Sequence, residues 1–186
     1  DRAAFCVTGS EAVLGAIRAA RTVTGKDKIV FFTGDYHGII DEVLVKTTVN
    51  GDQIRTMPIA PGIPKENVQN SITLEYGTEE SLKIIEKLLP EIAAVMVEPV
   101  QARRPDFQPK EFLQKLRKMT ETADVALIFD EVITGFRSTQ GGAQEFFDVK
   151  ADIGTFGKVI GGGFPIGVIA GKKLYMDAFD GGSWQY

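Results

Sequence analysis

The chain has 186 residues, of which 44% are apolar and 25% are charged, and its formal net charge is -4. This composition is typical of a soluble globular protein and excludes a disordered chain. No run of basic residues is longer than two, so the sequence lacks the charge pattern of a nucleic-acid-binding protein. Its single cysteine, Cys6, and single histidine, His37, exclude a disulfide framework and a zinc finger, and we expect a reducing, cytoplasmic location.

Residues 159–171 form the longest uncharged apolar stretch, but they are rich in glycine and too few to span a bilayer. We therefore expect no membrane segment and no membrane partner. The chain begins at Asp1 without an initiating methionine or a signal-peptide pattern, so we expect it to be part of a longer protein.

Short β-rich runs alternate with amphipathic helical patterns, which predicts an α/β fold with a largely parallel sheet. The predicted strands are residues 4–7, 29–32, 72–74, 93–97, 125–129, 152–156 and 168–170. Apolar residues recur every three or four positions in the predicted helices, which are residues 11–24, 79–89 and 109–122. Residues 50–71 contain three prolines and no clean period, so we expect an irregular segment there.

Ligands of parallel sheets bind at the carboxyl ends of the strands, so the residues that follow each strand matter most. Thr8 and Glu11, after the first strand, have the spacing of a capping box at the start of a helix. Gly9 and Ser10 lie between them, where the helix presents free backbone N–H groups and its positive end. The motif can hold a phosphate, although a helix cap alone also explains it.

Two charged residues stand where burial is expected. Asp130 ends the apolar run 125–129, and an unpaired carboxylate there would be costly, so it requires helix N-cap donors or a cationic ring nitrogen. Lys158 is the only charged residue of segment 157–171. Burial would lower the pKa of this amine and suit it to form a Schiff base; a snorkelling or phosphate-binding lysine is the alternative.

Tyr36 and His37 stand between Gly34 and Gly38 in a predicted tight loop, where an aromatic ring can lie against a flat ligand. Two exposed turn residues would explain the dipeptide equally well. The chain has neither a G-x-S-x-G motif nor a G-x-G-x-x-G motif, which disfavours hydrolase and dinucleotide chemistry. A phosphate site, a ring platform, a buried carboxylate and a lysine amine are together the contacts that pyridoxal phosphate requires.

Five segments resemble the motifs of class-III pyridoxal-phosphate aminotransferases. They are Gly9-Ser10-Glu11-Ala12, Tyr36-His37-Gly38, Glu98-Pro99-Val100, and residues 129–137 and 155–163. The resemblance implies a fold-type-I large domain, built on a mainly parallel seven-stranded sheet with helices on both faces. It also implies that residues 1–186 are the central part of that domain, that the small domain lies outside this chain, and that the complete protein is a homodimer.

The resemblance also assigns roles to residues of these motifs. It implies that Lys158 and Asp130 are catalytic, Lys158 through a Schiff base and Asp130 by pairing with the pyridine nitrogen. The implied cofactor-binding set is Gly9, Ser10, Tyr36, His37, Asp130, Val132 and Lys158. In two places the sequence departs from relatives: Val7 stands where many have Asn, and Ile133 where the ornithine-type branch has Gln.

Within the family the chain is most similar to the glutamate-1-semialdehyde aminotransferase branch. The likeness is greatest to aminotransferase domains of hybrid polyketide synthase/nonribosomal peptide synthetases of the microcystin, iturin and mycosubtilin kind, carried by residues 98–109. It implies transfer from an amino donor to a β-ketoacyl thioester on a carrier protein. A free-standing glutamate-1-semialdehyde 2,1-aminomutase or another ω-aminotransferase is the alternative. Arg103 and Arg104 are expected in an ordered loop on the ligand face, where they can meet an anionic carrier arm.

Overall fold

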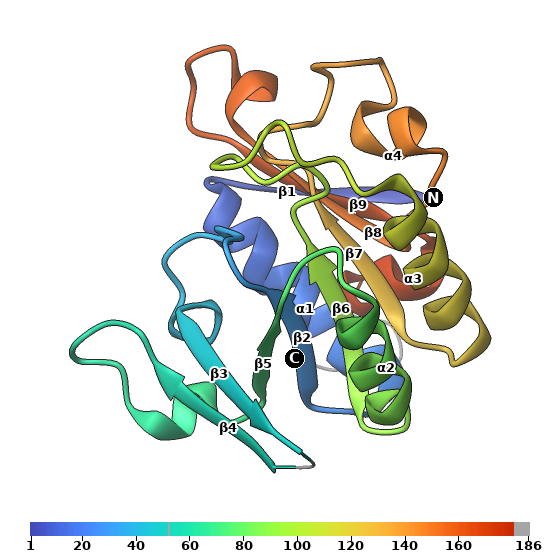
Figure 1. Cartoon of the computed structure of the whole chain (residues 1–186). Helices are drawn as coiled ribbons and strands as arrows, with labels where there is room; N and C mark the ends of the chain where they lie inside the picture. The colour runs from blue at the N-terminus through green and yellow to red at the C-terminus, as the bar shows by residue number, and fades with distance from the viewer. Residues whose placement is uncertain (52, 181–186) are drawn as a thin grey trace.

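A seven-stranded sheet forms the centre of the computed structural model, which describes residues 1–51 and 53–180 (Figure 1). Its strands are β1 (Arg2–Cys6), β2 (Lys28–Phe32), β5 (Ser71–Leu74), β6 (Ile92–Val97), β7 (Ala126–Asp130), β8 (Ile153–Phe156) and β9 (Gly167–Gly171). Their order across the sheet is β1-β9-β8-β7-β6-β2-β5. All seven predicted strands are confirmed, with ends that differ by one or two residues.

The strand directions bring most carboxyl ends to one edge of the sheet. Strand β2 is parallel to β5 and β6, and β7 is parallel to β6 and β8. Strand β9 is antiparallel to both β8 and β1, so β1 runs in the same direction as the parallel strands. The mainly parallel seven-stranded sheet is therefore confirmed, and every strand of it except β9 ends at the same edge.

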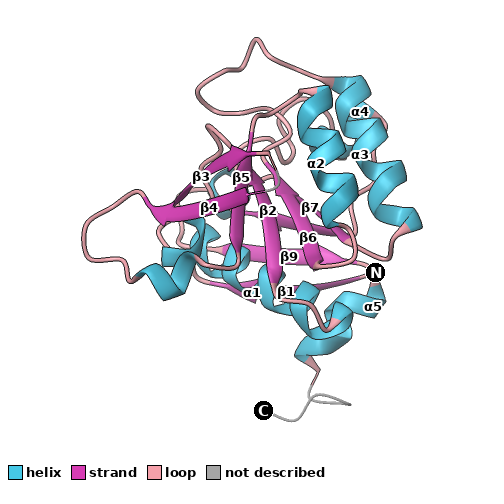
Figure 2. Cartoon of the chain, turned by 60° about the horizontal axis from the view of Figure 1, so that its bottom comes forward, coloured by secondary structure: helices cyan, strands magenta, loops and turns pink. Residues whose placement is uncertain are grey.

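Helices cover both faces of the sheet, as predicted. Helix α1 (Gly9–Thr24) packs on one face, and α2 (Glu79–Leu88) and α3 (Lys110–Thr122) lie on the other (Figure 2). Successive residues of a strand enter opposite cores: in β7, Ile128 packs with α1, whereas Phe129 packs in the core of α2 and α3. Burial on both faces explains why these strands read as continuous apolar runs rather than alternating ones.

The prediction of an irregular segment at residues 50–71 is wrong in part. Strands β3 (Val45–Asn50) and β4 (Gln53–Pro58) form a separate antiparallel pair, which Figure 1 shows at the side of the main sheet. Pro58 ends β4 and the other prolines follow it, so none removes a hydrogen bond from the strand interior. Threonines attach the pair to β5: the Thr73 N–H donates to Thr47 Oγ1 at 2.9 Å, and the Thr56 hydroxyl donates to the Ser71 carbonyl at 2.9 Å.

Two short helices, α4 (Gly142–Phe147) and α5 (Lys173–Met176), were not predicted because each is too short to show a helical period. Single 3-10 turns occur at Asp41–Val43, Lys65–Val68, Lys158–Gly161 and Asp177–Phe179. Among the described residues, none of the helices has the length and apolarity needed to cross a membrane.

Candidate functional site

The strand ends converge on a cavity of about 170 Å³ at the carboxyl edge of the sheet. Its walls come from the residues that follow β1, β2, β7 and β8. All seven residues predicted from the sequence line it: Gly9, Ser10, Tyr36, His37, Asp130, Val132 and Lys158. The structure therefore brings together side chains that lie far apart in the sequence.

The first turn of α1 forms one wall of the cavity. The predicted capping box is present: the Glu11 N–H donates to Thr8 Oγ1 at 3.1 Å, and the Thr8 N–H donates to Glu11 Oε2 at 2.9 Å. The N–H groups of Gly9 and Ser10 have no acceptor within the helix. They stand at its positive end beside the cavity, which is the arrangement that binds phosphate.

The loop after β2 closes against this helix. Ser10 Oγ accepts a hydrogen bond from the Ile39 N–H at 3.3 Å. Gly38 has a φ of +95°, and a Cβ at that position would lie 2.2 Å from Ser10 Oγ. Only glycine lets the loop approach the helix this closely. As a result, Tyr36 is placed at the cavity with half of its surface exposed, and His37 is placed beneath it with only 4% exposed. The alternative of two exposed turn residues is thus wrong for His37.

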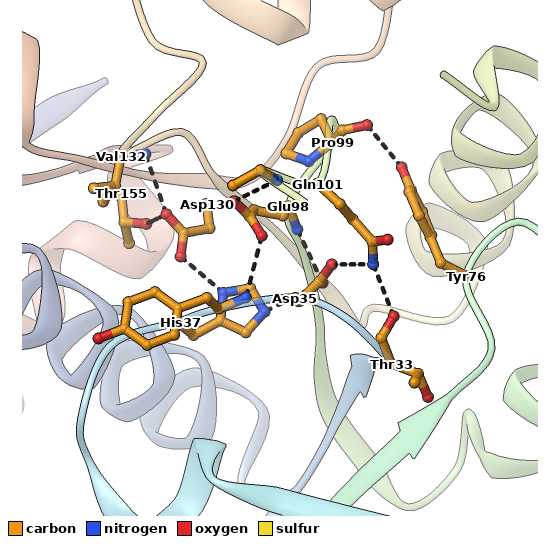
Figure 3. A network of polar contacts seen from close by, with 12 residues as sticks. Thr33, Asp35, His37, Tyr76, Glu98, Pro99, Gln101, Asp130, Val132 and Thr155 are labelled. Carbon is orange, nitrogen blue, oxygen red and sulfur yellow. Dashed lines mark hydrogen bonds and ion pairs between the residues drawn. The ribbon is translucent and has the colours of Figure 1, made fainter. Parts of the chain in front are cut away.

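Asp130 lies at the end of β7 and is 3% exposed. Its Oδ1 accepts hydrogen bonds from the Val132 N–H at 3.1 Å and the Thr155 hydroxyl at 3.2 Å. Its Oδ2 accepts one from His37 Nδ1 at 2.7 Å (Figure 3). No helix begins at Asp130, so the prediction's alternative of a simple N-cap residue is wrong.

His37 lies between two carboxylates. Asp130 is on its Nδ1, and Asp35 Oδ2 is 3.3 Å from its Nε2, at ion-pair distance but without the alignment of a hydrogen bond. Burial alone would lower the pKa of His37, but the hydrogen bond to Asp130 and the charges of both carboxylates outweigh it and raise the pKa to about 10. Both carboxylates therefore favour the cationic form of the imidazole.

A second set of polar residues lies next to His37, and none of them was assigned a role from the sequence. Asp35 accepts hydrogen bonds from Gln101 Nε2 at 2.7 Å and from the Glu98 N–H at 3.1 Å. Glu98 accepts one from the Tyr36 N–H at 3.1 Å. Burial, reinforced by the nearby charge of Asp35, raises the pKa of Glu98 to about 7. Two signals for these residues were present in the sequence: their position directly after β2 and β6, and the Glu98-Pro99-Val100 motif of the family resemblance.

Lys158 lines the cavity, but the expectation that it is buried is wrong. The side chain is exposed, and the residue has a φ of +46° at the start of a 3-10 turn. The lack of other charges around it reflects exposed glycines rather than burial, since Gly162 and Gly163 are both exposed. Lys158 thus lines the cavity and is also exposed to solvent.

A larger cavity of about 450 Å³ lies beside the first and shares Tyr36 and His37 with it. Arg103 borders this second cavity, from a loop rather than a helix, as predicted. The Arg104 guanidinium instead lies 4.4 Å from the centre of the Phe107 ring, a cation–π contact. Among the described residues, no three His, Cys, Asp or Glu side chains are grouped so that they could hold a metal ion.

Comparison with known proteins places these features in a family. The family model described as "Aminotransferase class-III" matches residues 1–185. The chain is 48% identical over 177 residues to a glutamate-1-semialdehyde 2,1-aminomutase of Methanococcus maripaludis, an alignment that covers 94% of this chain and 41% of that protein. The chain thus spans about two fifths of the length of this curated relative.

Solved structures agree with this family. An ω-transaminase from Sphaerobacter thermophilus superposes with a TM-score of 0.88 at 35% identity, covering 97% of this chain and 42% of that one. A transaminase solved with pyridoxal phosphate bound gives a TM-score of 0.87 at 33% identity, covering 98% and 43% respectively. These matches confirm the predicted fold class.

Proposed function

Because the chain belongs to the class-III aminotransferase family, we propose that the complete protein containing it moves amino groups with pyridoxal phosphate as cofactor. The observation that carries the proposal is one cavity lined by a helix N-terminus, a buried carboxylate and a lysine amine. Family membership and the cofactor-bound relative both indicate pyridoxal phosphate. We further propose that residues 1–186 are the central part of the large domain of a cytoplasmic homodimer.

The residues of the cavity fit this cofactor. The N–H groups of Gly9 and Ser10 would hold its phosphate, and the absence of a side chain at Gly9 matters because a Cβ there would lie 3.1 Å from Val132 Cγ2. Tyr36 and Val132 would hold the ring between them. Three donors already contact the Asp130 carboxylate, which leaves it acceptor capacity for a ring N–H.

The bound cofactor supplies an electron sink for the reaction. Asp130 would keep a proton on the ring nitrogen, because a neighbouring carboxylate stabilises the protonated, cationic form of that nitrogen. The Lys158 amine would serve as the acid–base group: it would take a proton from the α-carbon of the amino donor and deliver it to the C4′ atom of the cofactor. Tyr36 and Val132 orient the ring and keep water from its faces.

We propose glutamate-1-semialdehyde as the substrate, with the amino group moved between adjacent carbons as in an aminomutase. The identity of 48% to proteins of that name supports this assignment. The second candidate is a β-ketoacyl thioester on a carrier protein, which would receive the amino group from a separate amino donor. Arg103 supports this second candidate because it borders a cavity that shares Tyr36 and His37 with the cofactor site.

A direct assay separates the two candidates. The complete protein, loaded with pyridoxal phosphate, is given glutamate-1-semialdehyde alone, or a carrier-bound β-ketoacyl thioester with an amino donor. The proposal predicts turnover of the semialdehyde. Turnover only of the carrier-bound substrate, with a selective loss in the double variant Arg103→Ala and Arg104→Ala, would establish the second candidate. Turnover of neither would refute both.

A further inference from the structure

We propose that His37 is a positioning residue for Asp130, and that Asp35 holds the His37 imidazole in its cationic form. This inference rests on the proposed function, because it concerns how the chain prepares the carboxylate that would meet the cofactor ring. It gives Asp35 a role and assigns His37, already expected among the cofactor-binding residues, the role of orienting Asp130; neither has to touch the reacting atoms.

The contacts of Asp130 fix the orientation of its carboxylate. Oδ1 is held by the Val132 N–H and the Thr155 hydroxyl, and Oδ2 is held by His37 at 2.7 Å. An ionised carboxylate has about four acceptor positions, so three donors leave about one, on Oδ2. Without His37, Oδ2 would have no fixed partner in the structure, and the carboxylate could turn away from the cavity.

Asp35, which faces the other side of the His37 ring, is held in turn by its own polar contacts (Figure 3). Gln101 Nε2 donates to Asp35 Oδ1 at 2.7 Å and to the Thr33 carbonyl at 2.9 Å, which fixes Asp35 from the loop after β6. The other oxygen, Oδ2, faces His37 Nε2 at 3.3 Å. With a carboxylate at each ring nitrogen, the imidazole is most stable with both nitrogens protonated.

The charged groups around His37 come from four parts of the chain. Asp35 belongs to its own loop, Asp130 to the end of β7, and Glu98 to the segment after β6; Lys158 lines the same cavity. The side chains of Asp35, His37 and Asp130 are all at most 3% exposed, so water does not screen their interaction. A substitution at Asp35 therefore acts on Asp130 through the imidazole.

The test is a double-mutant cycle on the complete protein. The dissociation constant of pyridoxal phosphate is measured by spectroscopic titration for His37→Asn, Asp35→Asn and the double variant. Losing a hydrogen bond to a charged group predicts a dissociation constant about tenfold to a hundredfold higher for His37→Asn, and a smaller rise for Asp35→Asn. Since Asp35 acts through His37, the double variant should be no worse than His37→Asn alone.

A second readout follows the imidazole directly. Histidine nitrogen NMR, with the His37 signal identified by its loss in His37→Asn, should show a cationic ring from about pH 6 to about pH 9 in the wild type. In Asp35→Asn the ring should become neutral at lower pH. This measurement needs no activity and no bound cofactor, and it remains informative if His37→Asn binds cofactor too weakly to titrate.

Asp152→Asn is the matched control, because Asp152 is also a buried, ion-paired carboxylate but precedes β8 at the opposite edge of the sheet. It should leave the dissociation constant unchanged. Additive losses in the double variant, or a neutral His37 in the wild type at about pH 7, would overturn the proposal. If Asp130→Asn also bound cofactor as the wild type does, the proposed function itself would fail; if only His37 and Asp35 were without effect, the failure would be confined to this inference.

Discussion

The exchange of Asp130 for Asn tests the chemistry of the site with the smallest change of shape. An asparagine retains one oxygen for the Val132 N–H and the Thr155 hydroxyl, which contact Oδ1 in the wild type. Its amide nitrogen would then face His37 Nδ1, which donates to Oδ2. Two donors would oppose each other in a buried space, and the cofactor ring would lose its anionic partner.

The magnitude follows from these lost contacts. Removing one partner of a buried ion pair costs about 3–5 kcal/mol, and about 1.4 kcal/mol corresponds to a factor of ten. If the cost falls on the transition state, Asp130→Asn should lower the rate of amino transfer by roughly two to four orders of magnitude. Stopped-flow absorbance of the cofactor with an amino donor measures this rate. A variant that keeps a tenth of the wild-type rate would show that Asp130 is a structural residue.

Two further predictions concern stability and pH. A Cβ at Gly142, where φ is +64°, would lie 2.3 Å from Glu131 Oε2, whereas Gly25, at a φ of +67°, has nothing within 4 Å. Urea unfolding should therefore show Gly142→Ala to be less stable than Gly25→Ala by about 1–3 kcal/mol, the cost of disturbing the buried Glu131 hydrogen bonds; equal losses would contradict this. The pKa of Glu98 is raised to about 7, so the folded state binds the proton of this carboxyl group more tightly than the unfolded state does. The wild type should therefore lose stability as the pH rises from about 4.5 to about 7. In Glu98→Gln, the loss of unfolding free energy between pH 5 and pH 8 should be smaller than in the wild type by up to about 3 kcal/mol. An equal loss in both proteins, measured by unfolding curves at the two pH values, would refute this prediction.

Most of the fold could be predicted from the sequence because the strands of the main sheet are buried on both faces. A run such as residues 126–130, bounded by polar segments, has few other stable conformations. The β3–β4 pair escaped prediction because the nearby prolines suggested irregular backbone, and nothing in the local pattern shows that the first of them ends the strand and the others follow it. Helices of four or six residues carry no period to detect.

The residues of the site could be predicted because they follow strands that end at one edge of the sheet. The burial and the contacts of these residues could not be predicted. Lys158 seemed buried because its neighbours are uncharged, but several of those neighbours, among them Val159, Gly162 and Phe164, are exposed. His37 could have been an exposed turn residue; its burial between Asp35 and Asp130 depends on contacts across as many as 93 sequence positions. Long-range polar contacts of this kind leave no local signal in the sequence.

We propose that Lys158 is the residue that carries the cofactor, and chemical labelling of the protein can identify that residue. The complete protein is incubated with pyridoxal phosphate, the covalent link is fixed by borohydride reduction, and the modified peptide is identified by mass spectrometry. We expect the label on Lys158, and we expect Lys158→Ala to carry no label at any specific position. A label on another lysine, or none in the wild-type protein, would contradict it.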